Sequence, residues 1–249
     1  MARIDFLGIP IDALTFNETL SCVDRYIDSC QPHQLIAINA AKIVIAHQNP
    51  EFLNILRQSD LNFVDGKPIM FAARLLGDRF PELISGHFLM ESMVARAAKH
   101  GYSVYFLGAK PDVTAKVVDV FRNRYSGLNI AGWRNGFWKP EEEHEVVDCV
   151  RESGAHILFL ALGTPRKEKW INQYKVELQV PVCMGVGGSF DIVAGLLKVE
   201  PGWMRASGLA WLFRLIQEPK RLWKRYASTN PKFVKLVLRG VWERVFWED

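Results

Sequence analysis

Short apolar runs alternate with amphipathic segments along the first 200 residues of the chain. Each run is rich in β-branched or aromatic residues and ends at a small or polar residue, where a helical pattern begins. Five such junctions end at Asn39, Asp65, Gly108, Gly163 and Gly187/Gly188. Continuous apolar strands that alternate with helices predict an α/β fold, in which helices cover both faces of a parallel sheet.

The five junctions predict where a ligand binds. In a parallel sheet of this kind, ligands bind beyond the carboxyl ends of the strands. Glycines there let a ligand approach the backbone, and helix N-termini offer N–H groups and a positive dipole to an anion. Two interpretations stay open: the glycines form a pocket for a phosphate-bearing ligand, or they only make tight turns.

Polar residues at the junctions are candidates for chemistry. Asp65 stands alone in the apolar run LNFVD, so burial would raise its pKa and suit it to act as a general base. The alternative is that it caps the following helix, whose first turn tolerates Pro68. Asn39 has the same two interpretations. Asp191, four residues after Gly187, either accepts a hydrogen bond from a ligand or caps the next helix.

Basic and aromatic residues near the junctions also have two interpretations each. Arg166, Lys167 and Lys169 open a helix, where cations oppose the helix dipole. They either meet an anionic ligand or form a solvated face. Phe137 and Trp138 lie in the predicted loop NGFWKP, where an exposed ring can stack on a nucleotide base and a buried ring packs in the core.

The chain changes character at Pro201. From there onward it holds ten Lys and Arg against four Asp and Glu, a net charge of +6, whereas the first 200 residues hold 21 against 23, a net charge of −2. Five of the eight tryptophans also lie after residue 200. We therefore divide the chain into a core of residues 1–200 and a basic, tryptophan-rich appendage of residues 201–249 with its own partner.

The appendage is expected to form two or three short helices. Leu209, Leu212, Phe213 and Ile216 make one apolar stripe, and Pro219 ends that helix and begins another. A second stripe, with basic residues on another face, is typical of a helix in a membrane interface. It consists of Val234, Val237, Leu238, Val241 and Val245, with Lys232, Lys235, Arg239, Trp242 and Trp247 nearby. The alternative is a basic, solvated face on a helix that docks onto the core.

Missing motifs narrow the function. The sequence contains no P-loop, H-E-x-x-H, G-x-S-x-G or D-x-D, and its six histidines show no ligand spacing, which argues against a metal enzyme and a serine hydrolase. GVGGSF lacks the last glycine of a dinucleotide fingerprint, which weakens the case for an oxidoreductase. Four scattered cysteines predict reduced thiols of a cytosolic protein, and neither a secretory signal nor a spanning apolar segment is expected.

The stretch GVGGSFDIVAGLLKVEPGWMRASGLAWLFRLIQEPKRLWKRY closely resembles the C-terminal signature of the WecG/TagA/CpsF glycosyltransferases. The resemblance extends upstream through AINAAKIV, FVDGKPIM, YFLGAKPDV, NGFWKP and LALGTPRKE, in order. These bacterial enzymes add a sugar to a lipid-linked intermediate of teichoic acid, enterobacterial common antigen, capsule or exopolysaccharide. The resemblance implies a Rossmann-like α/β core with a helical appendage, inverting transfer from a UDP-sugar, and no metal or other cofactor.

The resemblance also implies roles for individual residues. Asp65 matches the general base of the V-D-G motif, and Asn39 matches an active-site asparagine. The residues on segments similar to the nucleotide and sugar pocket are Gly108, Phe137, Gly163, Lys167, Gly187, Gly188 and Asp191. The appendage cations expected to meet the diphosphate are Arg214, Arg221, Lys224 and Arg225.

The implied partners are a UDP-sugar, a polyprenyl-diphosphate-linked acceptor and the membrane surface. The protein is then cytoplasmic and peripheral on the inner face of the cell membrane, with nucleic acid not expected and a homo-oligomer left open. Leu83, Phe88 and Lys167 stand where many relatives carry an arginine, an acidic residue and a glutamine. Because these positions lie near the sugar or acceptor end, N-acetylmannosamine, its uronic acid, glucose and galactose all remain open. A basic nucleic-acid- or membrane-binding module without activity, and an oxidoreductase, are the alternatives.

Overall fold

The computed structural model describes residues 2–247, with backbone only for residues 245–247. Its strands are β1 (Arg3–Phe6), β2 (Ile9–Asp12), β3 (His33–Ile38), β4 (Leu61–Val64), β5 (Ser103–Gly108), β6 (Asn129–Arg134), β7 (Ile157–Ala161) and β8 (Val182–Gly185). Its helices are α1 (Phe16–Ser29), α2 (Ala40–Gln48), α3 (Pro50–Gln58), α4 (Lys67–Leu75), α5 (Gly86–His100), α6 (Pro111–Arg124), η1 (Pro140–Glu142), α7 (Glu143–Glu152), α8 (Arg166–Leu178), α9 (Ser189–Val193), α10 (Gly202–Ser207), α11 (Ala210–Gln217) and α12 (Pro219–Trp247).

Six of these strands form one parallel sheet in the order β4-β3-β8-β7-β5-β6. The predicted α/β fold is confirmed, and each of the five junctions joins a strand of this sheet to the helix that follows. Three strands were not expected from the sequence: β1 and β2, which form an antiparallel hairpin, and the edge strand β6. β6 lacks a continuous apolar run because it is only partly buried at the edge of the sheet.

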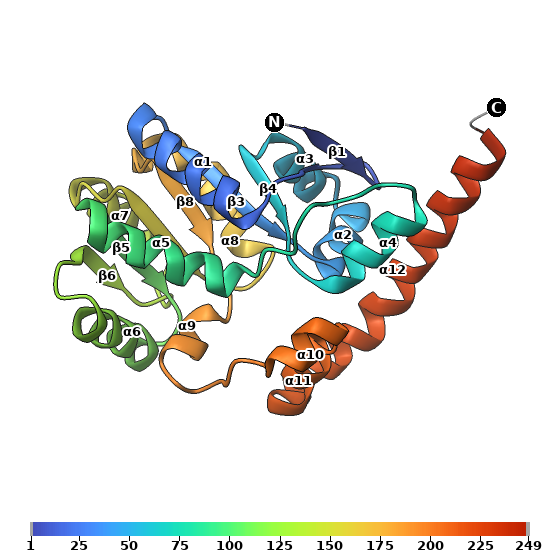
Figure 1. Cartoon of the computed structure of the whole chain (residues 1–249). Coiled ribbons are helices and arrows are strands. Elements are labelled where there is room, and N and C mark those ends of the chain that lie inside the picture. The colour runs from blue at the N-terminus through green and yellow to red at the C-terminus, as the bar shows by residue number, and fades with distance from the viewer. Residues whose placement is uncertain (1, 248–249) are drawn as a thin grey trace.

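Successive side chains along each strand point to opposite faces of the sheet. In β3, Ala37 packs in a cluster with α1, α5, α6 and α9, whereas Ile36 packs with the hairpin, α2, α3 and α4. Farther along the second face, Leu158 and Leu160 of β7 pack against α7 and α8. Figure 1 shows the sheet between these two layers of helices. Coverage on both faces is the reason why the central strands are continuous apolar runs in the sequence.

The appendage consists of α10, α11 and α12, and only the first two are short. Pro219 begins α12, as predicted, but this helix continues for 29 residues, so the expectation of short helices throughout was wrong. Phe233 and Val237 of α12 pack into the apolar cluster that contains α2 and α4. Pro231 removes one backbone hydrogen bond from the helix interior. The free energy gained by packing against the core exceeds the cost of this lost bond, so the helix continues.

Because α12 docks onto the core, only part of the second apolar stripe is buried. Val237 is buried and Val241 is partly buried, whereas Val234 and Leu238 are exposed. The side chains of Val245 and Trp247 lie outside the described residues. Helix α12 therefore uses one face to dock onto the core and leaves another face accessible. Within residues 2–247, none of the helices is both long enough and apolar enough to cross a membrane.

Candidate active site

A cavity of about 1440 Å³ opens at the carboxyl ends of the central strands, with α11 and α12 forming its remaining wall. Of the predicted site residues, Gly108 and Lys224 do not line it. Those that do are Asn39, Asp65, Phe137, Gly163, Lys167, Gly187, Gly188, Asp191, Arg214, Arg221 and Arg225. Because the appendage supplies part of the wall, the core alone does not contain the whole site.

Asp65 directly follows β4 and lies in the cavity wall. Helix α4 has Gly66 at its N-cap, with no side-chain capping hydrogen bond, so the interpretation of Asp65 as a cap was wrong. Burial raises the pKa of the Asp65 carboxyl, although the charges of Lys42 and Arg214 and a hydrogen bond from the Gly86 backbone oppose that rise. A carboxylate of raised pKa in a cavity wall is suited to take a proton from a bound hydroxyl group.

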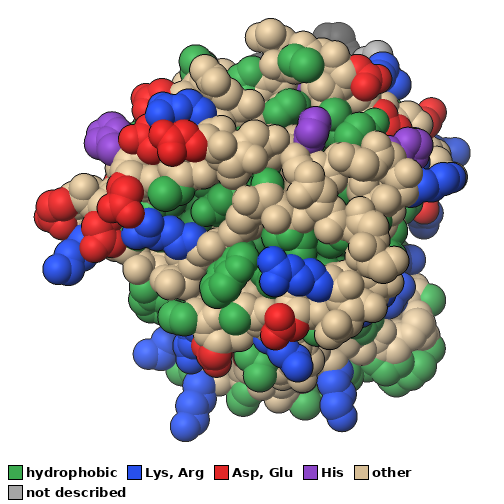
Figure 2. Space-filling view, turned by 90° about the vertical axis from the view of Figure 1, so that its left-hand side faces the viewer, with side chains coloured by type: hydrophobic (Ala, Val, Ile, Leu, Met, Phe, Trp, Pro, Cys, Tyr) green, Lys and Arg blue, Asp and Glu red, His purple; other side chains and the backbone are tan. Residues whose placement is uncertain are grey.

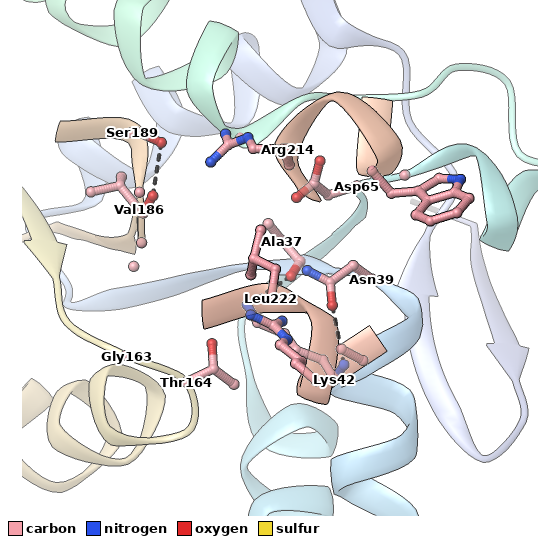
Figure 3. Close-up of a pocket in the computed structure, with 18 of the residues that line it drawn as sticks. Ala37, Asn39, Lys42, Asp65, Gly163, Thr164, Val186, Ser189, Arg214 and Leu222 are labelled. Atoms are coloured by element: carbon pink, nitrogen blue, oxygen red, sulfur yellow. Dashed lines mark hydrogen bonds between the residues drawn. The ribbon is translucent and has the colours of Figure 1, made fainter. Parts of the chain in front are cut away.

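Asn39 caps α2, because its Oδ1 accepts a hydrogen bond from the backbone N–H of Lys42 at 3.1 Å. The capping interpretation is therefore confirmed for this residue. Capping uses only the oxygen, and the amide nitrogen donates to no described residue. Figure 3 shows Asn39 close to Asp65, with both side chains directed into the cavity that Arg214 also enters. Capping and ligand binding thus do not exclude each other at Asn39.

Glycines at the junctions are required for different reasons. At Gly108 the angle φ is +113° and a side chain would collide with the backbone of Ala161 in the neighbouring strand, so this glycine serves the packing of the sheet. At Gly188 an added Cβ would lie 3.1 Å from the guanidinium of Arg214, so glycine lets this arginine approach the backbone. Gly163 lines the cavity, and a Cβ there would meet no atom within 4 Å.

Three appendage cations line the cavity: Arg214 of α11, and Arg221 and Arg225 of α12. Arg221 is held by Glu218, whose carboxylate accepts a hydrogen bond from the arginine Nε at 2.6 Å. Among the described residues, no carboxylate lies within ion-pair distance of the Arg214 guanidinium, although its positive charge lowers the pKa of Asp65. The guanidinium of Arg225 has no carboxylate partner among these residues either, so Arg214 and Arg225 are both more available to an anionic ligand than Arg221.

Asp191 lies in the first turn of α9, where Gly188 occupies the N-cap position. The interpretation of Asp191 as a helix cap was therefore wrong. Burial is the main cause that raises the pKa of its carboxyl, followed by the charge of Glu218, while Arg221 and Arg214 lower this pKa. The carboxyl lies in the cavity wall, as the ligand-binding interpretation requires.

The loop NGFWKP places its two aromatic rings in opposite environments. Phe137 is 69% exposed and lines the cavity, so its ring can stack on a flat ligand. Trp138 is buried against Trp170 of α8, with ring centroids 6.0 Å apart, and the guanidinium of Arg166 lies over its ring. Core packing is therefore confirmed for Trp138, whereas the stacking of Phe137 on a ligand stays a prediction.

Of the basic residues at the start of α8, Lys169 lies on a solvated face and Lys167 does not. Lys169 pairs with Glu51 at the surface, as expected for such a face. Lys167 is buried instead and pairs with Glu168 at 3.0 Å, and the same carboxylate oxygen lies 2.8 Å from Nζ of Lys42. Sequence reasoning missed Lys42 and Glu168. The available signal was the single charged residue, Lys42, within the apolar helix AAKIVIA.

A second cavity of about 390 Å³ shares Asp65 with the first. Its wall includes Leu83 and Phe88, two of the positions that the resemblance led us to expect near the sugar or the acceptor. The guanidinium of Arg205 lies 4.1 Å from the centroid of the Phe88 ring and pairs with Glu200 at 2.9 Å. Asp65 therefore lies where a large cavity and a small one meet. Among the described residues, no three His, Cys, Asp or Glu side chains are arranged to hold a metal ion.

The fold and the cavity define an α/β protein with a large cavity beyond the carboxyl ends of a parallel sheet, where proteins of this class bind their ligands. The model of the glycosyl transferase WecG/TagA/CpsF family matches residues 4–245, nearly the whole chain. The chain belongs to this family of glycosyltransferases, which act in the synthesis of cell-surface polysaccharides and in general join a sugar donor to a lipid-linked acceptor. The resemblance noted in the sequence is confirmed, and membership favours a glycosyltransferase over an oxidoreductase or a module without activity.

Proposed function

We propose that this chain is an inverting glycosyltransferase. It moves a sugar of the hexose or N-acetylhexosamine type from a UDP-sugar to a polyprenyl-diphosphate-linked sugar acceptor. The observation that carries this proposal is the position of Asp65 where two cavities meet, with Arg214 in the wall of the larger one. A donor in the larger cavity and an acceptor in the smaller one would meet at this carboxylate.

In the proposed step, the Asp65 carboxylate takes the proton of an acceptor hydroxyl as its oxygen attacks the anomeric carbon. A new C–O bond forms on the face opposite the diphosphate. The bond between the anomeric carbon and the diphosphate oxygen breaks, and its electron pair leaves with UDP. Attack from the opposite face inverts the configuration of the anomeric carbon.

UDP gains negative charge as this bond breaks. The guanidinium of Arg214 is available to that charge, and Arg221 can join it if it exchanges Glu218 for a phosphate oxygen. Charge-assisted hydrogen bonds of this kind stabilise a transition state most in a site with little water. We therefore expect the arginines to do what a divalent cation does in many other nucleotide-sugar enzymes.

Purified protein, a panel of UDP-sugars and a lipid-diphosphate sugar acceptor test this function directly. We expect release of UDP that requires the acceptor and that continues in EDTA, because cationic side chains stabilise the leaving group. Release of UDP is the measurement. Release that does not depend on the acceptor would contradict transfer, and release that stops in EDTA and returns with Mg²⁺ would contradict the role given to the arginines.

We also place the appendage on the inner face of the cell membrane, where a lipid-linked acceptor would lie. Trp203 of α10 and Trp223 of α12 are 65% and 54% exposed, and the Lys224 ammonium lies 5.8 Å from the Trp223 ring. Indole rings favour the membrane interface, and basic side chains are attracted to anionic headgroups. Figure 2 shows several Lys and Arg side chains that project from the lower edge of the molecule.

Replacing Trp203 and Trp223 together by serine is expected to weaken binding to vesicles of anionic lipid by roughly tenfold, because two apolar rings no longer enter the interface. Co-sedimentation with vesicles measures this. Trp133→Ser is the matched control, since Trp133 is 44% exposed on β6 in the core. Equal pelleting of the double variant and the unchanged protein would reject this contact. Point variants are preferred to truncation because Phe233 and Val237 belong to the core cluster.

A further inference from the structure

Part of the wall of the larger cavity consists only of uncharged, apolar residues from two helices, α4 and α12. The residues of α4 recur at helical spacing and so share one face: Pro68, Phe71, Ala72 and Leu75. Those of α12 do the same: Phe233, Val234, Val237 and Leu238. The two sets adjoin, because Ala72 belongs to the same apolar cluster as Phe233 and Val237, and Figure 1 shows α12 running past α4. We call these eight residues the apolar groove.

The apolar groove has a buried floor and exposed walls. Its floor includes Ala72, Phe233 and Val237, which are buried in the core cluster. Its walls carry large apolar side chains that are between 51% and 69% exposed, namely Phe71, Leu75, Val234 and Leu238. Apolar side chains gathered in water around a depression mark a surface that a ligand or partner covers, because covering them is favourable.

Helix α12 changes from cationic to apolar along the face that lines the cavity. Arg221 and Arg225 lie near its start, and the apolar residues begin eight positions later at Phe233, about 12 Å farther along the helix axis. This order suits a ligand that carries an anionic group with a hydrocarbon chain attached. A UDP-sugar has no such chain, so the donor of the proposed function does not account for the apolar groove.

The apolar groove begins beside the proposed point of sugar transfer. Pro68 follows Asp65 by three residues, in the first turn of α4. Pro68 and Trp211 line both the larger and the smaller cavity, so the two cavities adjoin there. A chain attached to an acceptor sugar in the smaller cavity can therefore pass Pro68 and enter the groove.

We propose that the apolar groove binds the hydrocarbon chain of the lipid-linked acceptor, at the end nearest the diphosphate. This inference rests on the proposed transfer to such an acceptor. Because α4 has nine residues and is about 13 Å long, the groove holds only the first part of a polyprenyl chain, and the rest continues into the membrane. These side chains line the same cavity as Asp65, which a surface that only rests on the membrane does not require.

Titration calorimetry of the full-length protein with two soluble prenyl diphosphates tests the groove. Farnesyl diphosphate has three isoprene units and dimethylallyl diphosphate has one, whereas their diphosphates are the same. Saturating UDP keeps both probes out of the UDP site, and vesicles are left out. We expect farnesyl diphosphate to bind about tenfold or more tightly, because its additional apolar surface leaves water.

Replacing Leu75 and Leu238 together by glutamine is expected to remove this preference and to leave the affinities for dimethylallyl diphosphate and UDP unchanged. Both side chains are largely exposed, so we expect the double variant to fold, with thermal unfolding as the check. Val176→Gln is the matched control, since Val176 of α8 is 74% exposed and lines neither cavity. Val234→Gln, in the same groove, is a second variant that is expected to weaken the preference.

Equal affinity of the unchanged protein for the two diphosphates would overturn the groove, and so would a preference that both groove variants keep. Equal affinity together with reduced vesicle binding by the double variant would assign these side chains to the membrane surface instead. Release of UDP that depends on the lipid-linked acceptor would leave the proposed function standing in either case. Conversely, a preference for farnesyl diphosphate that the double variant loses, in a protein that transfers no sugar, would support the groove and overturn the transfer.

Discussion

Replacing Asp65 by asparagine is expected to lower kcat for sugar transfer by about 10³-fold or more, near the upper range for a positioned general base. Asparagine keeps the size of the side chain but cannot take the proton of the acceptor hydroxyl. UDP is expected to bind as before, because the proposed diphosphate contacts come from the appendage arginines. Initial rates of UDP release and titration with UDP measure the two quantities separately.

The pH dependence of transfer gives a second measure of Asp65. A general base acts in its ionised form, so activity falls as the pH drops below its pKa. Because burial raises the pKa of Asp65, we expect the acid limb of kcat/KM to lie above about 4, the range of an ordinary aspartate.

The exposed Asp119 on α6 supplies the control for Asp65, and Asp119→Asn is expected to leave transfer unchanged. Substantial turnover by Asp65→Asn, with the same acid limb as the unchanged protein, would place the general base at another residue.

Replacing Arg214 by alanine is expected to lower kcat by about 10²- to 10³-fold, the cost of removing one donor that stabilises developing negative charge. The guanidinium lines the cavity and has no ion-pair partner among the described residues, so its charge is available to the leaving diphosphate. Arg221 is expected to matter less, because Glu218 already holds its guanidinium. Single-turnover rates with saturating donor measure the effect.

Arg122→Ala is the matched control for Arg214, because Arg122 is exposed on α6, a core helix. We also expect Arg214→Lys to recover part of the lost rate, since the charge remains while the paired hydrogen bonds of the guanidinium are lost. If Arg214→Ala raises KM for the donor and leaves kcat unchanged, the arginine only binds the ground state, and its proposed role in the departure of UDP is wrong.

Local patterns in the sequence were enough to predict most of the fold. A strand buried on both faces must be apolar throughout, and the turn into the next helix must be small or polar, so both signals lie within a few neighbouring residues. The hairpin of β1 and β2 and the edge strand β6 were missed because their side chains are less uniformly apolar. The length of α12 was also missed, since it depends on the docking of Phe233 and Val237 onto distant helices.

Single positions at the site were harder to predict, because one residue type serves several purposes. Asp65 and Asn39 both end a strand before a helix, yet only Asn39 caps the helix that follows it. Phe137 and Trp138 are adjacent and both aromatic, yet one is exposed and the other is buried. Their environments depend on neighbours from other parts of the chain, which no local pattern records.

The sequence by itself determined the alternation of strands and helices, the edge of the sheet at which the large cavity lies, and the family to which the chain belongs. Only the tertiary structure decided that Arg214 approaches Gly188 and that Asp65 lies between two cavities. It also decided that Lys42 shares a carboxylate with Lys167. The physical reason is that strand and helix patterns act between near neighbours, whereas burial and charge pairing join residues that are far apart in the chain.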